Sequence, residues 1–479
     1  MLANQIWRIG GSMKFLLLLF TTILYIHLSA TIINIPEDYS TIQEGIVQAM
    51  IGDTILVNPG TYFENINFIG KDILLTSHFL FGEDPSYIDE TIIDGSNPTN
   101  PDTTSTIVFC NNETEATIIQ GFTITGGGGT VWIDPQLPAL IWFSGGGIFM
   151  YYSSPTIRHN YIKENIVINS NNYDGASGGG LLCFRGDPTI TNNIISLNQA
   201  DYGAGVVVDY SGAIIQNNLI IENTGGQLYG GGGFYFIGND TEPIIVENNT
   251  IAENHSETTG GAMRMMSSTI TAQNNIIWNN TQISGGPIYY WGASTITFSN
   301  VEGGFTGEGN IDLDPQFIDE ELYLLDENSP CIDAGNPDQT FNDPEDPNNP
   351  GQAQFPSQGT TLNDMGVYGG PLSACFQQTS IENNTIIHSV IEMWNYPNPF
   401  NPTTTIAYSI VEPGNITINV FNTKGQLITT LVNETREAGN YTVTWDGTDK
   451  SNKPVSSGIY FYKIKAGTNV FTKKMILLK

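Results

Sequence analysis

Short apolar runs separated by polar pairs recur along the first two thirds of the chain. Six times between residues 157 and 302, an apolar residue is followed by a polar pair ending in Asn and then by two mostly apolar residues. The closing residues of these phrases are Asn160, Asn193, Asn218, Asn249, Asn275 and Asn300, and five phrases carry a further Asn five residues later: Asn165, Asn198, Asn223, Asn254 and Asn280. A spacing of 25 to 33 residues without helical periodicity predicts a parallel β-solenoid of stacked coils.

The repeated asparagines are interpreted as structural residues. Asn tolerates the left-handed backbone of a sharp corner, and stacked Asn side chains can form hydrogen-bonded ladders from coil to coil. An aliphatic residue two positions after each Asn predicts a core filled in register by Ile162, Ile195, Ile220, Ile251 and Ile277. The Gly-rich runs at residues 145–147 and 178–180 match no phosphate-binding loop and are interpreted as corners. About 270 residues at about 25 per coil predict about eleven coils.

Side chains alternate in and out along each predicted strand that precedes a repeated Asn. One parity is interpreted as core: Ile148, Leu181, Val206, Phe234, Met263 and Ile288, with Met150, Cys183, Val208, Phe236, Met265 and Tyr290. The opposite parity forms an outward row: Phe149, Leu182, Val207, Tyr235, Arg264 and Tyr289, with Tyr151, Phe184, Asp209, Ile237, Met266 and Trp291.

This outward row is more aromatic and apolar than a solvated sheet face, and contiguous exposed apolar surface usually marks an interaction site. Aromatic rings spaced along a rod would suit sugar rings. The carbohydrate-binding candidates are Phe149, Tyr151, Phe184, Tyr235, Tyr289 and Trp291, with Asp209 and Arg264 as polar anchors. Two alternatives remain open. The insertion at residues 130–143, which carries Trp132 and Trp142, could fold over the face, or the face could bind a protein.

The net charge of −32 is unevenly distributed along the 479 residues. Residues 31–385 carry 5 basic and 42 acidic groups, whereas residues 386–479 carry 9 basic and 6 acidic groups. This difference indicates two unlike pieces. An acidic body offers no surface for phosphates, so nucleic acid is not an expected partner, and no basic amphipathic stretch suggests membrane binding.

The N-terminus has the pattern of a secretory signal peptide over residues 1–30. Lys14 precedes an apolar run at residues 15–26, and the small residues Ser29 and Ala30 follow. The run is too short for a membrane span, so no transmembrane segment is expected in the mature chain. The four cysteines fit neither a zinc pattern nor a dense disulfide framework, and Cys183 is predicted to be a buried thiol; the others are Cys110, Cys331 and Cys375.

Residues 35–43 lead into a short amphipathic helix through Met50, which would cover the open first coil. This opening resembles that of secreted right-handed β-helix proteins of the pectin-lyase-like superfamily. Residues 52–62, 91–95 and 121–124 are similar to early coils of that family, and residues 329–335 and 364–370 are similar to segments that often end such helices. The resemblance covers roughly residues 33–370 and implies the fold more specifically than any activity.

Catalysis is a competing hypothesis. The resemblance implies that lyases of the superfamily use a basic residue and often calcium. The Asp-Asp doublet and the Gly-His-Gly of polygalacturonase-type hydrolases are absent. Glu222 and Glu253 occupy the same position in neighbouring coils, about 5 Å apart, near the carboxylate separation of retaining glycosidases, although glutamates on outward turns are usually only solvated. Calcium could be held by Asp312, Asp314, Asp343 and Asp346, which match no EF-hand pattern.

The C-terminal piece has a different pattern. From about Met393 the Asn phrases vanish, and alternating strands are predicted at residues 405–409, 415–421, 426–431, 439–446, 458–465 and 470–478. Six or seven short strands in about 85 residues predict a small immunoglobulin-like β-sandwich.

The motifs of this piece are Tyr396, Pro397, Asn398, Pro399, Phe400, Asn401 and Pro402, then residues 424–425, 445–447 and 454–460, and a closing segment that begins with Lys473 and Lys474. They resemble the type A C-terminal sorting domain of type IX secretion. The resemblance implies export across both membranes of a diderm bacterium by the type IX machinery, followed by surface attachment or release. The alternative is an ordinary immunoglobulin-like accessory or adhesion domain.

The sequence therefore predicts an all-β protein with four parts. These are a signal peptide (1–30), a right-handed parallel β-helix with an N-terminal capping helix (31–370), a linker (371–392) and a C-terminal sorting β-sandwich (393–479). The leading hypothesis is a secreted or surface-displayed protein that binds carbohydrate or has a structural role without catalysis. A lyase or hydrolase acting on acidic polysaccharide, and an adhesin, are the alternatives.

Overall fold

The computed structural model describes residues 31–169, 173–238, 243–292, 294–319, 321–373 and 376, and most of residues 393–478. Within the last range, residues 397–399, 411–413, 423–425, 438, 452 and 467–468 are outside the described part. The predicted signal peptide, Cys375, Pro397, Asn398, Pro399 and nearly all of the predicted linker therefore lie outside the described residues.

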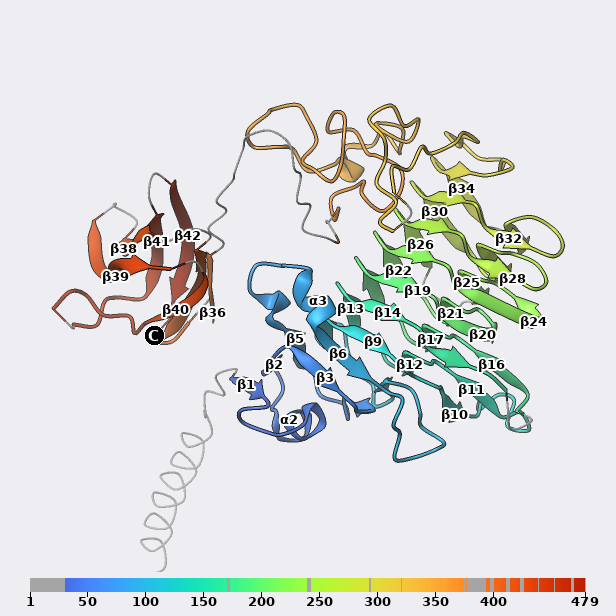
Figure 1. The fold of residues 1–479 in the computed structure, drawn as a ribbon, viewed down its shortest axis with the longest axis horizontal. Coiled ribbons are helices and arrows are strands. Elements are labelled where there is room, and N and C mark those ends of the chain that lie inside the picture. The colour runs from blue at the N-terminus through green and yellow to red at the C-terminus, as the bar shows by residue number, and fades with distance from the viewer. Residues whose placement is uncertain are drawn as a thin grey trace, which may run out of the picture.

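The N-terminal body is a right-handed β-helix whose short strands form four sheets (Figure 1). Sheet A contains β1 (Ile32–Ile35), β2 (Thr54–Val57), β5 (Leu74–Ser77), β8 (Ile118–Gln120), β13 (Thr156–Arg158), β18 (Thr189–Thr191), β22 (Ala213–Gln216), β26 (Ile244–Glu247), β30 (Ile270–Gln273) and β34 (Thr295–Thr297). Sheet B contains β3 (Gly60–Tyr62), β6 (Thr91–Asp94), β9 (Thr123–Thr125), β14 (Tyr161–Lys163), β19 (Ile194–Ser196), β23 (Leu219–Ile221), β27 (Thr250–Ala252), β31 (Ile276–Trp278) and β35 (Asn300–Val301).

Sheet C contains β4 (Ile66–Asn67), β7 (Ile107–Phe109), β12 (Ile148–Tyr151), β17 (Leu181–Phe184), β21 (Val206–Asp209), β25 (Phe234–Ile237), β29 (Met263–Met266) and β33 (Ile288–Trp291). Sheet D contains β10 (Thr130–Trp132), β11 (Trp142–Ser144), β15 (Ile166–Val167), β16 (Gly175–Ser177), β20 (Gln199–Tyr202), β24 (Thr224–Gly230), β28 (His255–Ser256) and β32 (Thr281–Gln282). Every pair in sheets A to C is parallel, and in sheet D only β10 and β11 pair antiparallel, as a hairpin.

The predicted capping helix is α2 (Ile42–Gln48), which covers the first coil. Ile42 and Ile46 are fully buried in the main core, as expected for an element that shields an open end. The Nζ of Lys71 donates to the carbonyl oxygens of Ile46, Val47 and Ala49 at 2.6–2.7 Å, so a cation satisfies the carbonyls at the end of the helix. The other short helices are η1 (His78–Leu80), α3 (Ser86–Glu90) and η2 (Gln339–Phe341).

The core is continuous along the stacked coils. The aliphatic column predicted from Ile162 to Ile277 pairs in register across sheet B and is fully buried. The inward parity predicted for sheet C is also confirmed from Ile148 to Met265. Cys183 is a fully buried thiol whose Sγ lies 3.4 Å from both the Gly186 carbonyl and the Ser211 hydroxyl.

Two ladders of buried asparagines run along the corners, as the repeat predicts. The Nδ2 of Asn193, for example, donates to Asn218 Oδ1 at 3.0 Å and to two backbone carbonyls, while its Oδ1 accepts from the Nδ2 of Asn160, the preceding Asn in the ladder. One assignment is wrong. Ser299, rather than Asn300, continues the first ladder, because its hydroxyl accepts the N–H of Asn275, whereas Asn300 opens β35.

The number of coils is smaller than predicted. Eight coils contribute a strand to each of sheets A, B and C, instead of about eleven coils. The reason is that the early coils are longer than about 25 residues: in sheet A, Leu74 pairs with Ile118 and Ile118 with Thr156, which lie 44 and 38 residues apart. The residues that follow β35 form loops. They cover the ends of sheets A and B, where Phe298 N–H bonds Glu308 O at 2.7 Å and Val301 N–H bonds Ile311 O at 2.9 Å.

The same loops then fold back over the outer side of sheet B and form a second core. Outward residues of sheet B such as Leu219 and Ile221 pack there against Leu322, Tyr323 and Tyr368. The Nδ2 of Asn217 donates to the carbonyls of Val367 and Gly369, and Tyr161 Oη donates to Phe376 O at 2.5 Å. The outer side of sheet B is therefore occupied by the chain itself.

The C-terminal module is an antiparallel sandwich of seven strands, in agreement with the prediction. One sheet contains β36 (Met393–Tyr396), β37 (Thr404–Ile410) and β40 (Gly439–Trp445), and the other contains β38 (Gly414–Asn422), β39 (Leu427–Arg436), β41 (Gly458–Ala466) and β42 (Asn469–Leu477). Its core includes Trp445, Tyr462 and Met475, all nearly or fully buried.

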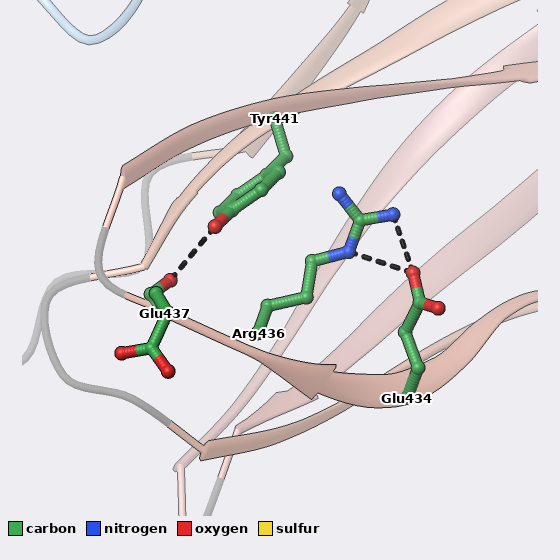
Figure 2. Close-up of polar contacts among 4 residues, drawn as sticks. All are labelled: Glu434, Arg436, Glu437 and Tyr441. Atoms are coloured by element: carbon green, nitrogen blue, oxygen red, sulfur yellow. Dashed lines mark hydrogen bonds and ion pairs between the residues drawn. The ribbon is translucent and has the colours of Figure 1, made fainter.

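The turn between β39 and β40 is fixed by a small surface cluster (Figure 2). The guanidinium of Arg436 pairs with the carboxylate of Glu434 at 2.5 Å and lies 4.5 Å from the ring of Tyr441. The hydroxyl of Tyr441 donates to the Glu437 carbonyl at 3.0 Å, which closes the turn. Because these groups are partly exposed, the cluster contributes little to stability.

Candidate functional site

The outward side chains of sheet C form two rows, and in each row they lie in register across the strands. The first runs Phe149, Leu182, Val207, Tyr235, Arg264 and Tyr289, and the second runs Tyr151, Phe184, Asp209, Ile237, Met266 and Trp291. The register is the one that the repeat predicts. The rows are nevertheless not one continuous surface, because their exposure differs from end to end.

The first part of the face, from β12 to β25, is covered; we call it the covered zone. The hairpin β10–β11 places Trp132 over it, with ring centroids 4.6 Å from Phe184 and 6.1 Å from Tyr151. Phe149 is 3% exposed and Phe184 1%. The expectation that these rings form an exposed row is therefore wrong, and the alternative of a covering insertion is correct for this part.

Tyr235, also predicted to be outward and accessible, is buried by other neighbours. The ring of Tyr202 from sheet D lies 5.3 Å from it, and the guanidinium of Arg264 lies 5.8 Å from its centroid on the next strand. Its exposed fraction is 6%. The ring of Tyr235 is therefore packed against its neighbours and is not accessible to a ligand.

Asp209 lies in the covered zone, between Phe184 and Ile237 in register. Its Oδ1 is buried and has no hydrogen-bond partner among the described residues. Burial, followed by the nearby charge of Asp134 on the hairpin, raises the pKa of Asp209 to about 7, and the charge of Arg185 opposes this shift. One oxygen of the Asp209 carboxyl group is therefore buried near Asp134 of the hairpin, so Asp209 is a poorer anchor than its place in the outward row predicts.

The far end of the face remains accessible; we define Arg264, Tyr289 and Trp291 as the open zone. Tyr289 is 38% exposed and Trp291 68%. The guanidinium of Arg264 lies 4.8 Å from the centroid of the Tyr289 ring, and its NH1 donates to the Thr259 hydroxyl. Arg264 Nε is buried without a hydrogen-bond partner among the described residues. Aromatic rings beside a few polar groups are the usual composition of a small-ligand site.

Two neighbours of the open zone were missed by sequence reasoning. Tyr290, predicted to be core by its parity, is 54% exposed, and Ile283 is 73% exposed. Both lie on the last strands or corners of sheets D and C, where no further coil stacks, and Tyr290 contacts Phe305 edge-on at 5.5 Å. The end of the Asn repeat near residue 300 was the available signal that an inward side chain here would have no coil above it.

The two carboxylates proposed as a catalytic pair lie elsewhere. Glu222 and Glu253 have left-handed backbone conformations at the corner between sheets B and D, and both side chains are exposed. Their position one residue before a ladder Asn explains the left-handed φ values of 55°. The structure thus places them on a solvated corner, away from the strands of sheet C that carry the aromatic residues.

The four calcium candidates accept backbone N–H groups and do not converge. The carboxylate of Asp312 accepts the N–H of Gly303, that of Asp314 accepts the N–H of Gln316, and that of Asp346 accepts the N–H of Asn348. Asp343 is buried and accepts from the N–H groups of Asp364 and Gly370, and burial followed by the charge of Asp364 raises its pKa to about 8. In the part of the chain that the structure describes, no three His, Cys, Asp or Glu side chains gather closely enough to hold a metal ion.

The residues predicted to form a sorting motif join two distant segments of the C-terminal module. Phe400 is buried with its ring 5.5 Å from that of Trp445, while Asn401, Pro402 and Lys473 are exposed. The Phe400 N–H donates to Ile476 O at 2.9 Å, and the Leu478 N–H donates to Phe400 O at 2.8 Å. Tyr396 lies in β36 and Lys474 in β42. The motif around Phe400 and the closing strand therefore form one structural unit.

Comparisons with known proteins agree with this division. The family described as "Right handed beta helix region" matches residues 40–241 and 163–302, together more than half of the chain, and the family described as "FlgD Ig-like domain" matches residues 406–469. No curated protein matches. Among the described residues, no helix has the length and apolar character needed to cross a membrane.

Three solved structures are similar in part. Dimeric latent PorU from Porphyromonas gingivalis is 18% identical over 18% of this chain and 9% of its own (TM-score 0.16). PorZ from the same organism, titled an essential bacterial surface component of the type-IX secretion system, is 19% identical over 18% of this chain and 11% of its own (TM-score 0.15). Escherichia coli ybhc is 15% identical over 58% of this chain and 73% of its own (TM-score 0.28). This chain thus spans about a tenth of the first two, and such low TM-scores carry no argument about function.

Proposed function

This chain belongs to the right-handed β-helix family, and on that premise we propose that it binds carbohydrate on the open zone without cleaving it. The observation that carries the proposal is the pair of exposed rings, Tyr289 and Trp291, braced by the guanidinium of Arg264. The faces of aromatic rings carry negative charge density, which attracts the weakly positive C–H groups of a sugar ring. Adjacent rings on one strand would hold successive sugars.

The distribution of carboxylates supports binding over cleavage. A glycosidase needs two carboxyl groups flanking the bond to be broken. Asp209 lies beneath the hairpin, and Glu222 and Glu253 lie on the corner between sheets B and D. A lyase or hydrolase acting on acidic polysaccharide is the alternative, as is an adhesin that binds protein.

Replacing Trp291 or Tyr289 by alanine should weaken retention of the full chain in polysaccharide-containing native gels by about tenfold or more, since each ring loses its stacking contact. Phe63→Ala is the matched control, because Phe63 is 61% exposed near the opposite end of the β-helix, and it should leave retention unchanged. Equal retention of all three variants would contradict the proposal.

Turnover is tested on the same material. Mass spectrometry of polysaccharides incubated with the full chain, with and without calcium, should find them intact. Products with an added water would identify a hydrolase and unsaturated products a lyase. If products form and Glu222→Gln or Glu253→Gln abolishes them while binding persists, the chain is an enzyme.

We propose further that the C-terminal module directs the chain to the outer surface of a diderm bacterium through the type IX machinery. The sequence motifs that converge on Phe400 and the closing strand support this role, as does the immunoglobulin-like fold of the module. In this proposal the signal peptide at residues 1–30 directs export across the inner membrane, and cleavage within residues 371–392 releases the module.

Deleting residues 393–479 should abolish surface display in a host that has the type IX machinery, leaving the β-helix in the periplasm. Cell fractionation and surface labelling measure the outcome. Arg436→Gln is the control, because Arg436 belongs only to the exposed turn cluster and should not change export. Surface display of the truncated chain would show that export does not depend on the module.

A further inference from the structure

The open zone lies in a stretch of chain without charged residues. From Met265 to Val301 there is no Asp, Glu, Lys or Arg, a run of 37 residues, although residues 31–385 as a whole carry 42 acidic groups. This run supplies the last strands of all four sheets, including β33 with Tyr289 and Trp291. The last strands of the β-helix, which carry the open zone, thus contain no charged side chain in a strongly acidic body, and Glu302 and Glu308 follow only in the loops over the ends of sheets A and B.

The polar groups beside the rings are mostly uncharged. Gln282 Oε1 and Thr258 Oγ1 are buried without hydrogen-bond partners among the described residues; Gln282 lies in β32 of sheet D, and Thr258 lies on the corner that leads from sheet D to sheet C. Their positions are linked to the rings, because Ser284 N–H bonds Thr258 O at 2.8 Å and the adjacent Thr259 hydroxyl accepts from Arg264. Uncharged hydroxyl and amide groups can exchange hydrogen bonds with the hydroxyls of a sugar, but they cannot form an ion pair with a carboxylate or sulfate.

Arg264 is the one cation of the open zone, and its surroundings give it a structural role. Its guanidinium lies over the rings of both Tyr235 and Tyr289, at 5.8 and 4.8 Å from their centroids. A cation stacked on two rings holds those rings in place. One positive charge in a body with a net charge of −37 also does not make a surface that attracts polyanions.

From these observations we infer that the ligand of the open zone is an uncharged polysaccharide, held by ring stacking and hydroxyl hydrogen bonds rather than by ion pairs. This inference rests on the proposed carbohydrate binding and specifies its substrate class. A uronate-rich or sulfated chain would be repelled by the acidic body and would find no cluster of cations in the open zone.

The test compares uncharged and anionic polymers. The purified full chain is run in native gels containing a soluble β-glucan, a mannan, a galactomannan, polygalacturonate or alginate, at low salt and at about 0.5 M NaCl. We expect retention by at least one uncharged polymer, changing less than about twofold with salt because no ion pair is screened. Trp291→Ala should abolish this retention, whereas Phe63→Ala should not.

Arg264→Gln separates the two ligand classes further, because it keeps hydrogen-bonding capacity and removes the charge. For an uncharged ligand we expect the same fold loss of affinity at low and at high salt; a loss seen at low salt but not at about 0.5 M NaCl, together with salt-sensitive binding to polygalacturonate or alginate, would overturn the inference. That result would leave carbohydrate binding itself intact. Failure of every polymer to retain the chain would instead overturn the proposed function. Thermal unfolding checks that each variant is folded.

Discussion

Replacing Asn223 by alanine is expected to destabilise the β-helix by about 3–5 kcal/mol, because several buried polar groups lose their partners at once. The Nδ2 of Asn223 donates to Asn254 Oδ1, Ile195 O and Ile221 O at 2.8–3.0 Å. Its Oδ1 accepts from the backbone N–H and the Nδ2 of Asn198, both at 3.0 Å. Alanine offers none of these bonds, and the residue is fully buried, so water cannot replace them.

Chemical denaturation and amide hydrogen exchange in β19, β23 and β27 measure this loss. Exchange is needed because a stack of repeats can unfold locally, so that a single global midpoint would understate the effect. Glu222→Gln is the control: Glu222 is the preceding residue and its side chain is exposed, so the change should stay within about 0.5 kcal/mol. A loss below about 1 kcal/mol for Asn223→Ala would mean that the ladder does not stabilise the corners.

The periodic part of the fold could be predicted from the sequence because each coil repeats the same physical solution. An Asn at a corner and an Ile two residues later are fixed by hydrogen bonding and by packing against the coils on both sides. The prediction of the ladder was wrong at the last coil, where a residue has a neighbouring coil on one side only. Ser299 can replace a ladder Asn since only one acceptor is needed at the last coil, and this shifted the assignment to Asn300.

The aperiodic part could not be predicted. Described residues between Phe317 and Phe376 pack on the outer side of sheet B through single contacts, such as Asn217 with Val367 and Tyr161 with Phe376, that have no counterpart in other coils. No sequence period marks such contacts. The coil count was too high because insertions, such as the hairpin at residues 130–144, lengthen the early coils beyond about 25 residues.

The candidate site was predicted in its register but not in its exposure. The alternation along a strand fixes which side chains point outward, and the structure confirms this for Phe149 as well as for Trp291. Whether an outward residue is accessible depends on other segments. The hairpin at residues 130–144 covers Phe149 and leaves Trp291 exposed. The sequence left open whether this segment covers the face, because its apolar residues alone do not determine what they pack against.

Replacing Gly127 by alanine is expected to destabilise the β-helix by about 3 kcal/mol, because the new methyl group has no room. A Cβ on Gly127 would lie 1.8 Å from the Gly146 carbonyl oxygen. That oxygen accepts the Thr106 N–H at 3.0 Å, so it cannot move away without breaking a bond between coils. Both groups are backbone, and no side-chain rotation relieves the clash. Thermal and chemical unfolding of the purified chain measure the loss.

The matched control is Gly286→Ala, at a position near the open end of the same β-helix. A Cβ there would meet only Ile288 O, at an ordinary contact distance of 3.8 Å, and Gly286 does not have a left-handed backbone conformation. This variant should be neutral or stabilised by a few tenths of a kcal/mol, since alanine restricts the unfolded chain. Gly127 precedes β10, so in Gly127→Ala the amides of Val131 and Phe143 should also exchange faster as the hairpin shifts from the covered zone. Unchanged exchange and equal stability of the two variants would mean that this backbone contact is not tight.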